Sequence, residues 1–270
     1  MRQSELYIDV SEAYTTDAVI QTLRKFISLR GCPSKIICDQ GSQLKAAAKS
    51  DAWDWTKVKK WALSKKIVWE MVPADSQHMN GLSESMIKSI KRSISHVIGE
   101  SVLSFSEFQL MMYEIGNIIN SRPIGVVTGD DPDYLNHLTP NDLILGRSRN
   151  EVPHGPFESK PSLTKRFQYI QSLIDNWWKS WYLTVLPTLV PSYKWHHKYR
   201  NVKIGDVCLI SYKGQARASY KLGRVVGVHY GEDRLVRRVK LEYKLSTEKV
   251  YRTVERSIHG VAVIVPVDEQ

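Results

Sequence analysis

The spacing of apolar residues changes once along this chain, and that change limits the folds it can adopt. Residues 6–120 alternate short apolar runs with segments in which apolar residues recur every three or four positions. From Val202 onward, only short apolar runs separated by turn residues remain. The first pattern predicts strands alternating with helices, and the second predicts a small all-β unit.

The first part of the chain has the element order of an α/β domain. Thr15 and Asp17 are suited to begin a helix, and Gly31 followed by Pro33 is suited to end it. The expected elements, in chain order, are strand 6–10, helix 15–30, strand 35–38, helix 54–64, strand 67–72, and helices 82–98 and 106–120.

The middle of the chain reads differently. Residues 125–161 are rich in Pro, Gly, Asn and Asp and predict an extended connector. A helix is expected over 164–184, and Pro187 and Pro191 are expected to break the chain after it. This helix has an aromatic stripe that is suited either to stacking on bases or, more commonly, to packing. The stripe consists of Trp177, Trp178, Trp181 and Tyr182.

The last part of the chain predicts a small closed β-barrel, because short strands follow one another with tight turns. The expected strands are 204–210, 222–230, 235–245, 249–254 and 260–265.

Positive charge is concentrated in the second half. The chain has 38 Lys and Arg against 28 Asp and Glu, a formal charge of +10. Residues 1–150 contain 18 basic and 17 acidic side chains, a net +1, whereas residues 151–270 contain 20 and 11, a net +9. This asymmetry predicts an anionic polymer partner, with a merely solubilising surface as the alternative.

Other classes of protein are disfavoured. No apolar run approaches the roughly 18 residues that span a bilayer, and the first residues do not resemble a signal peptide. We therefore expect an intracellular protein, nuclear or cytoplasmic, without a membrane partner. Three cysteines without C-x-x-C spacing indicate neither a disulfide framework nor a zinc site.

Two carboxylates stand where such groups often act. Asp39 follows an expected strand, and Glu84 lies in the first turn of the helix after loop 73–81. On local grounds each has an ordinary explanation, as a turn residue and as a partner of the helix dipole. Lys88 and Lys91 share the helical stripe of Glu84. That stripe fits either a simple Glu–Lys pair or a metal-binding carboxylate beside phosphate-binding lysines.

Several segments carry a family resemblance. Residues 80–91, NGLSESMIKSIK, resemble the active-site helix of retroviral and retrotransposon integrases, and residues 38–44, CDQGSQL, resemble the Asp-containing turn of the same enzymes. Further segments resemble integrases of BEL/Pao-type long-terminal-repeat elements, so the similarity covers nearly the whole chain in order. They are residues 119–123, 138–147, 207–209, 222–225 and 256–260.

The resemblance implies a ribonuclease-H-like core in which Asp, Asp and Glu bind two Mg²⁺ ions about 4 Å apart for phosphoryl transfer. Asp39 matches the second acid and Glu84 the third, so both are expected to be catalytic and metal-binding. Asn80, Lys88 and Lys91 fall at positions implied to contact DNA. DNA is then the expected partner, with no small-molecule substrate, and self-assembly stays open.

The departures from the family pattern are informative. The sequence starts at the family's third strand, so the expected core is truncated at its N-terminus and lacks the first two strands and the first Asp. Asp9 lies in the wrong strand for that ligand and is expected to face solvent or an edge. One Asp and one Glu can share a Mg²⁺ that keeps its waters, so a weak or incomplete Mg site is expected. We expect no strand transfer by this polypeptide alone.

The basic module suits non-specific binding to DNA. Strand alternation is expected to bring several cations to one face, and six phosphate contacts predict a slope of about −5 in log affinity against log salt. The candidates are Arg234, Arg237, Arg238 and Lys240 around one hairpin, with Lys213, Arg217, Lys221 and Arg224 on the preceding pair.

Three parts are therefore predicted: a truncated integrase catalytic core (1–123), a helical connector with a Trp-rich helix (124–200), and a small all-β Src-homology-3-like barrel that binds DNA (201–270). The predicted function is that of an integrase-like protein, incomplete as a catalyst. One alternative is a non-enzymatic DNA- or chromatin-binding protein derived from such an element. A transposase-like nuclease that is active without the first strand is another.

Overall fold

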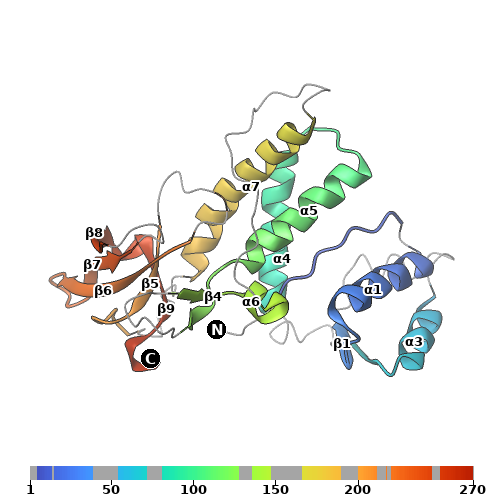
Figure 1. The fold of residues 1–270 in the computed structure, drawn as a ribbon, viewed down its shortest axis with the longest axis horizontal. Coiled ribbons are helices and arrows are strands. Elements are labelled where there is room, and N and C mark those ends of the chain that lie inside the picture. Colours follow the sequence, from blue (N-terminus) through green and yellow to red (C-terminus); the bar gives the residue numbers. More distant parts are fainter. Residues whose placement is uncertain are drawn as a thin grey trace. The chain divides into compact units, whose positions relative to one another are not determined.

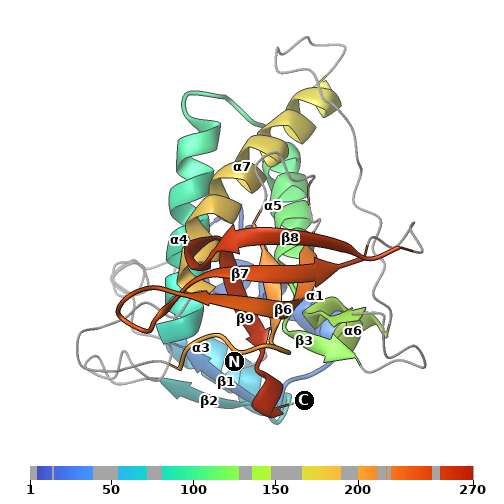
Figure 2. The same ribbon diagram turned by 90° about the vertical axis from the view of Figure 1, so that its left-hand side faces the viewer.

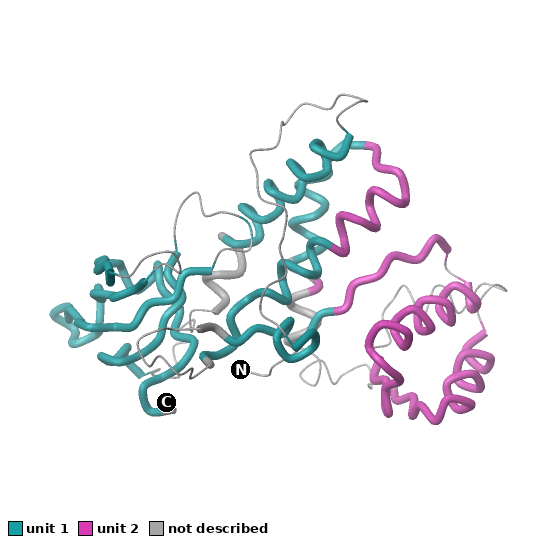
Figure 3. Tube along the Cα trace, in the orientation of Figure 1, with its two compact units in different colours: residues 1–6, 89–101, 114–270 teal, residues 7–88, 102–113 magenta. Residues whose placement is uncertain are grey.

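The computed structural model of this protein forms two compact units (Figure 3). The α/β unit holds residues 7–88 and 102–113, and the helix–sheet unit holds residues 1–6, 89–101 and 114–270. The residues that the structure describes are 5–13, 15–38, 54–71, 81–127, 136–146, 166–189, 200–211, 217, 220–244 and 250–269.

The first helix of the α/β unit begins and ends as its sequence predicts. α1 (Thr16–Arg30) is capped by Thr15, whose side chain accepts a hydrogen bond of 3.2 Å from the backbone N–H of Ala18. It ends at Gly31, which has a φ of 87° that a residue with a side chain rarely adopts. α3 (Trp55–Ser64) follows the first strand.

Two parallel strands complete this unit (Figures 1 and 2). β1 (Lys35–Cys38) pairs with β2 (Val68–Met71), and α3 connects them. Val58 and Ala62 of α3 and Ile67 before β2 are fully or nearly fully buried. The predicted β–α–β order is confirmed, and it makes the unit α/β in character.

The strand predicted over residues 6–10 does not form, since no strand is present between residues 5 and 11. Leu6 instead pairs with a side chain. Its N–H donates to Oδ1 of Asn120 (2.9 Å), and Nδ2 of Asn120 donates to its carbonyl oxygen (2.8 Å). A side-chain amide thus provides, at this residue, the hydrogen bonds that a neighbouring strand would have provided.

Two long helices match their predictions. They are α4 (Gly81–Ile98) and α5 (Phe105–Asn120), and each contributes residues to both units. Their buried apolar residues are spaced three or four apart, as a packed helical face requires. Those residues are Ile90, Ile94, Met111, Ile115, Ile118 and Ile119.

The connector predicted over 125–161 contains regular structure that composition did not reveal. β3 (Gly125–Val127) pairs antiparallel with β4 (Asn136–Leu138). α6 (Pro140–Leu145) follows, because Thr139 and Asp142 form a capping box and Pro140 occupies the first turn. Local capping chemistry therefore outweighs a loop-like composition here.

α7 (Arg166–Leu189) runs beyond its predicted end and includes Pro187, so the break expected there was wrong. A proline in the last turn removes only one helical hydrogen bond, which a long helix tolerates. The aromatic stripe packs inside the helix–sheet unit: Trp177, Trp178 and Trp181 are at most 2% exposed. Base stacking by these three rings is thereby excluded. No helix in the described part of the chain is long and apolar enough to cross a membrane.

The C-terminal residues form one antiparallel sheet in the order β8-β7-β6-β5-β9. All five predicted strands are confirmed, and a short helical turn, η3 (Ile258–Gly260), joins β8 to β9. Among the described residues no ladder joins β8 to β9, so the predicted closure into a barrel is not shown. The strands are β5 (Val207–Ile210), β6 (Lys221–Tyr230), β7 (Val236–Tyr243), β8 (Arg252–Ser257) and β9 (Val261–Val265).

One face of this sheet forms the core of the C-terminal part, around Cys208, Val225 and Leu241, each 0% exposed. All four residues of β5 are buried, so both faces of this strand are covered. Tyr182 of α7 donates a hydrogen bond of 3.2 Å to the carbonyl oxygen of Ile210. The Trp-rich helix and the sheet therefore belong to one packed unit.

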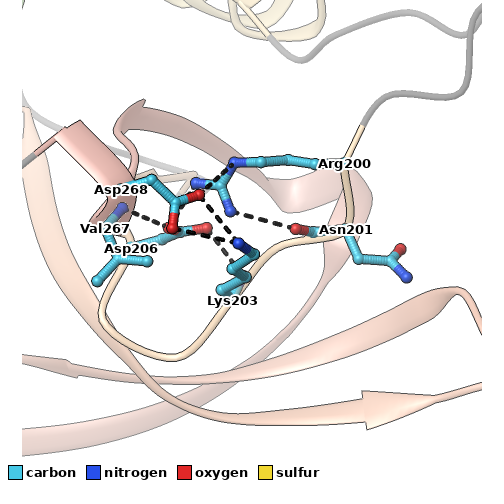
Figure 4. Close-up of polar contacts among 6 residues, drawn as sticks. All are labelled: Arg200, Asn201, Lys203, Asp206, Val267 and Asp268. Carbon is cyan, nitrogen blue, oxygen red and sulfur yellow. Dashed lines mark hydrogen bonds and ion pairs between the residues drawn. The ribbon is translucent and has the colours of Figure 1, made fainter.

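A buried carboxylate fastens the start of the sheet to its end (Figure 4). Asp206 is 0% exposed and accepts hydrogen bonds from Nη2 of Arg200 (2.7 Å), the N–H of Lys203 (2.9 Å) and the N–H of Val267 (2.8 Å). Asp268 adds an ion pair with Lys203 at 3.0 Å. With its charge satisfied in this way, Asp206 holds the loop before β5 against the turn after β9.

A buried guanidinium connects α5 and α7 in the helix–sheet unit. Arg217 is 4% exposed, and its nitrogens lie 2.7 Å from Oδ1 of Asp175 and 3.4 Å from Oε2 of Glu114. It also donates to the side chain (2.6 Å) and the carbonyl oxygen (2.7 Å) of Gln171. Burial raises the pKa of Glu114, while its bonds to Gln171 and Arg217 act in the opposite direction.

Replacing Arg217 with Met is expected to reduce the free energy of unfolding by about 3 kcal/mol, because two partly buried carboxylates lose their cation. Without Arg217 the pKa of Glu114 rises further above its unfolded value, so the loss should be larger near pH 7 than near pH 5. Urea unfolding at both pH values measures this. Lys179→Met on the exposed side of α7 is the control, and an equal loss in both variants would contradict the assignment.

Candidate nucleic-acid interface

The predicted catalytic residues are only partly within reach of the structure. Asp39 and Asn80 lie outside the described residues. Glu84 and Lys88 belong to α4, but only their backbone is described, whereas Lys91 of the same helix is exposed. Among the described side chains, no three His, Cys, Asp or Glu residues gather as a metal site would require. The Mg site remains a prediction.

The strands around the predicted metal site are described. β1 and β2 run parallel, and their last residues, Cys38 and Met71, lie opposite each other. Nε1 of Trp69 donates to Sγ of Cys38 at 3.2 Å and fixes this end of the pair. Asp39 is the next residue in the sequence after Cys38. In α/β sheets the carboxyl ends of parallel strands are the usual edge for ligand sites.

Three of the predicted DNA-binding residues lie on the outer face of the sheet. Arg238 and Lys240 of β7 are exposed and alternate with the buried Val239 and Leu241. Arg224 of β6 lies in register with Glu242, the next outward residue of β7. The predicted common face therefore exists for these three cations.

Acidic residues offset part of this charge. Glu242 is paired across the strands with Arg224, and Glu255 with Lys240. Glu255 also lies 3.7 Å from Nε2 of His229. The outer face thus carries fewer unopposed cations than the sequence count suggests, and Arg238 lies opposite the uncharged Ser257.

The other two predicted residues of the hairpin behave differently. Arg234 is exposed in the turn between β6 and β7, with a φ of 59°. Arg237 forms an ion pair with Asp233, four residues earlier. The pKa of Asp233 is lowered first by the N–H of Leu235 and then by Arg237. Arg234 is therefore presented to solvent, whereas Arg237 already has a carboxylate partner.

Arg217, expected among the phosphate-binding residues, is instead a buried structural residue. Its guanidinium donates hydrogen bonds to Gln171 and Asp175 and forms an ion pair with Glu114. Nothing in the sequence around Arg217 indicates that its side chain is buried. Its acidic partners, Glu114 and Asp175, lie on helices that the sequence predicts, but the sequence does not show that these helices pack against Arg217.

Asp9 was expected to face solvent or an edge, and this was wrong, because its side chain is 1% exposed. Its Oδ1 accepts hydrogen bonds from the N–H of Val10 (2.8 Å) and the hydroxyl of Tyr113 (3.0 Å), and Nε2 of Gln109 lies at 3.4 Å. Nζ of Lys25 lies 3.5 Å from Oδ2. Sequence reasoning missed this cluster, because its members are up to 104 positions apart.

The comparisons with known proteins bear on one part of the chain. Residues 165–263 match a family of unknown function (DUF5641). The match spans α7 and the sheet through most of β9, whose described residues all belong to the helix–sheet unit. No curated protein matches the chain. Helix and sheet are therefore similar to a domain seen elsewhere, whose function is unknown.

Titration of Tyr113 tests the cluster around Asp9. Burial, followed by the hydrogen bond to Asp9 and its charge, raises the pKa of Tyr113 to about 12. In Asp9→Asn the two contributions of the carboxylate disappear, so this pKa should fall toward its ordinary value of 10.0. NMR titration of the tyrosine ring signals measures it. Asp17→Asn, which removes an exposed acid paired with Lys57, should leave it unchanged; a fall in both variants would refute the contact.

Proposed function

We propose that this protein is a DNA-binding protein of the retroelement-integrase type, in which a ribonuclease-H-like core is joined to a small DNA-binding barrel. One observation carries the proposal. A single chain contains a parallel β–α–β unit whose first strand ends immediately before Asp39, followed by a separate antiparallel sheet with a basic outer face. Integrases combine these two kinds of module in this order.

The sheet order supports the barrel assignment. β5 lies between β6 and β9, and η3 separates β8 from β9. Five antiparallel strands in this order, with a helical turn before the last, are expected of a Src-homology-3-like barrel. Such a module presents one strand face to a partner while its apolar face stays buried.

The DNA contact proposed for this module is with phosphates. Arg238, Lys240 and Arg234 are exposed cations, and Arg238 and Lys240 lie on the outer face of the sheet. Cations on an open face contact the DNA backbone and give little sequence preference. Lys91 on α4 is a further exposed cation, at a position that the resemblance assigns to DNA.

Metal binding is proposed for Asp39 and Glu84, because carboxylates of this kind are the donors that Mg²⁺ prefers. A bound ion would supply charge stabilisation for phosphoryl transfer. Asp9 does not offer a third carboxylate, since it is buried among Val10, Gln109 and Tyr113 and lies beside Lys25. Binding of DNA by the outer face of the sheet requires no metal, so the second candidate is a non-enzymatic DNA- or chromatin-binding protein derived from an integrase.

The salt dependence of DNA binding tests the proposed surface. Four phosphate contacts, from Arg224, Arg234, Arg238 and Lys240, predict a slope of about −3.6 in log affinity against log salt for the full chain. Arg238→Gln with Lys240→Gln should reduce the magnitude of the slope by about 1.8, or 0.9 for each lost contact. Fluorescence anisotropy with a labelled duplex measures both values.

Arg237→Gln is the matched control, because Arg237 is already paired with Asp233. Arg237→Gln should change the slope by much less than Arg238→Gln or Lys240→Gln does. A slope near zero for the full chain, or a change of slope in Arg237→Gln as large as that in Arg238→Gln, would rule out this face as the DNA contact.

Strand transfer tests the catalytic part. The purified 270-residue chain is expected not to join donor DNA ends in the presence of Mg²⁺, because two matched carboxylates do not support a two-metal site. Joining is measured on gels with labelled donor ends, and an active retroviral integrase provides the positive control. Robust Mg²⁺-dependent joining that is lost in Asp39→Asn would show that the core is catalytically complete.

A further inference from the structure

An open pocket of about 540 Å³ lies on the α/β unit, formed by one side of α1 with Tyr7 and Tyr113. α1 contributes Arg24, Lys25 and Leu29 to its lining. Pockets that hold small ligands commonly measure about 300–1,000 Å³. This one is therefore large enough for an organic molecule and much larger than a simple inorganic ion needs.

The charge of the pocket favours an anion. No carboxylate among the described residues pairs with the guanidinium of Arg24. Nζ of Lys25 lies 3.5 Å from Oδ2 of Asp9, which is too far for a strong hydrogen bond, and the Lys25 side chain is 47% exposed. Asp9 itself accepts hydrogen bonds from the hydroxyl of Tyr113 and the N–H of Val10, so much of its charge is already compensated.

A buried polar atom of the pocket lining lacks a hydrogen-bond partner among the described residues. It is the hydroxyl oxygen of Tyr7. Oδ2 of Asp9, which is not part of the lining, has among these residues only Lys25 at 3.5 Å. Buried polar atoms are nearly always satisfied in folded proteins, so the hydroxyl of Tyr7, a residue that lines the pocket, calls for a water, ion or ligand that completes it. This observation is independent of the charge of the pocket.

We propose that this pocket binds a phosphate ester, with the phosphate on Arg24 and Lys25 and the organic part against Tyr7, Tyr113 and Leu29. A guanidinium beside an ammonium provides charge-assisted hydrogen bonds to phosphate oxygens. Aromatic rings and an exposed Leu offer apolar contact to a base or another planar group. The site belongs to the α/β unit alone and does not depend on the basic face of the sheet. A free nucleotide and the phosphorylated end of a nucleic acid share this chemistry.

Calorimetric titration of the full chain tests the proposal. Adenosine monophosphate is the first probe, and adenosine and inorganic phosphate are the comparison ligands. The monophosphate should bind at least about tenfold more tightly than either, because each of them provides only one of the two kinds of contact. Arg24→Ala should weaken its binding by about tenfold or more.

A second arm identifies the source of the phosphate. A short single-stranded oligonucleotide, with and without a 5′-phosphate, is titrated into the Arg238→Gln, Lys240→Gln variant so that the sheet contributes less, and the difference between the two oligonucleotides measures the contribution of the 5′-phosphate. Preference for the phosphorylated oligonucleotide over the monophosphate assigns the pocket to a nucleic-acid end, and the reverse assigns it to a free nucleotide. Either outcome supports the proposal if binding of the preferred probe is lost in Arg24→Ala.

Two further variants separate binding from folding. Ser28→Phe places a ring in the pocket without removing a charge and should abolish binding, whereas Lys57→Met, an exposed lysine paired with Asp17, should leave it intact. Thermal unfolding by circular dichroism shows whether each variant is folded. The proposal would be overturned if neither adenosine monophosphate nor the 5′-phosphorylated oligonucleotide binds. It would also be overturned if folded Arg24→Ala and Ser28→Phe bind these probes with unchanged affinity.

Discussion

The helix–sheet unit depends on one buried cation. Arg217 lies in the connection between β5 and β6, and its guanidinium contacts Glu114 of α5 and both Gln171 and Asp175 of α7. One side chain from the connection between two strands therefore joins two helices. Burying a charge is costly unless every donor finds an acceptor, and here the neighbours of Arg217 supply the acceptors. The segment that matches a family of unknown function contains Arg217 together with two of these three partners.

The same principle changes the meaning of the basic charge. The second half of the chain carries a net +9, but its cations are not all available to a partner. Arg217 is buried, and Arg237 is paired with Asp233. Arg200 is bound to the buried Asp206 (Figure 4). The cations that face solvent on the sheet are fewer, and two lie opposite Glu242 and Glu255. Net charge thus overestimates the strength of the surface.

Local sequence signals predicted most of the secondary structure, and three-dimensional neighbours decided the rest. The cap at Thr15, the period of α4 and the five C-terminal strands were predicted from adjacent residues. Helix α6 was not predicted, because its segment is rich in loop-forming residues and little beyond the Thr139–Asp142 capping box marks the start of a helix there.

Burial of charged residues was not predictable in the same way. Asp9 is buried by Tyr113 and Gln109 from a helix about 100 positions later, and Arg217 by residues of α5 and α7. Nothing within a few positions of either residue indicates these partners. Asp39 and Glu84 were singled out by their places after a strand and in the first turn of a helix, their roles as metal ligands followed from the family resemblance, and their proximity remains a prediction.

The central claim, that DNA lies on the outer face of the sheet, is tested most directly by lysine footprinting with mass spectrometry. Lys240 is exposed on β7, whereas Lys57 is exposed on α3 in the α/β unit and paired with Asp17. The account predicts that saturating duplex DNA slows acetylation of Lys240 and leaves Lys57 unchanged. Equal reactivity of Lys240 with and without bound DNA would contradict it.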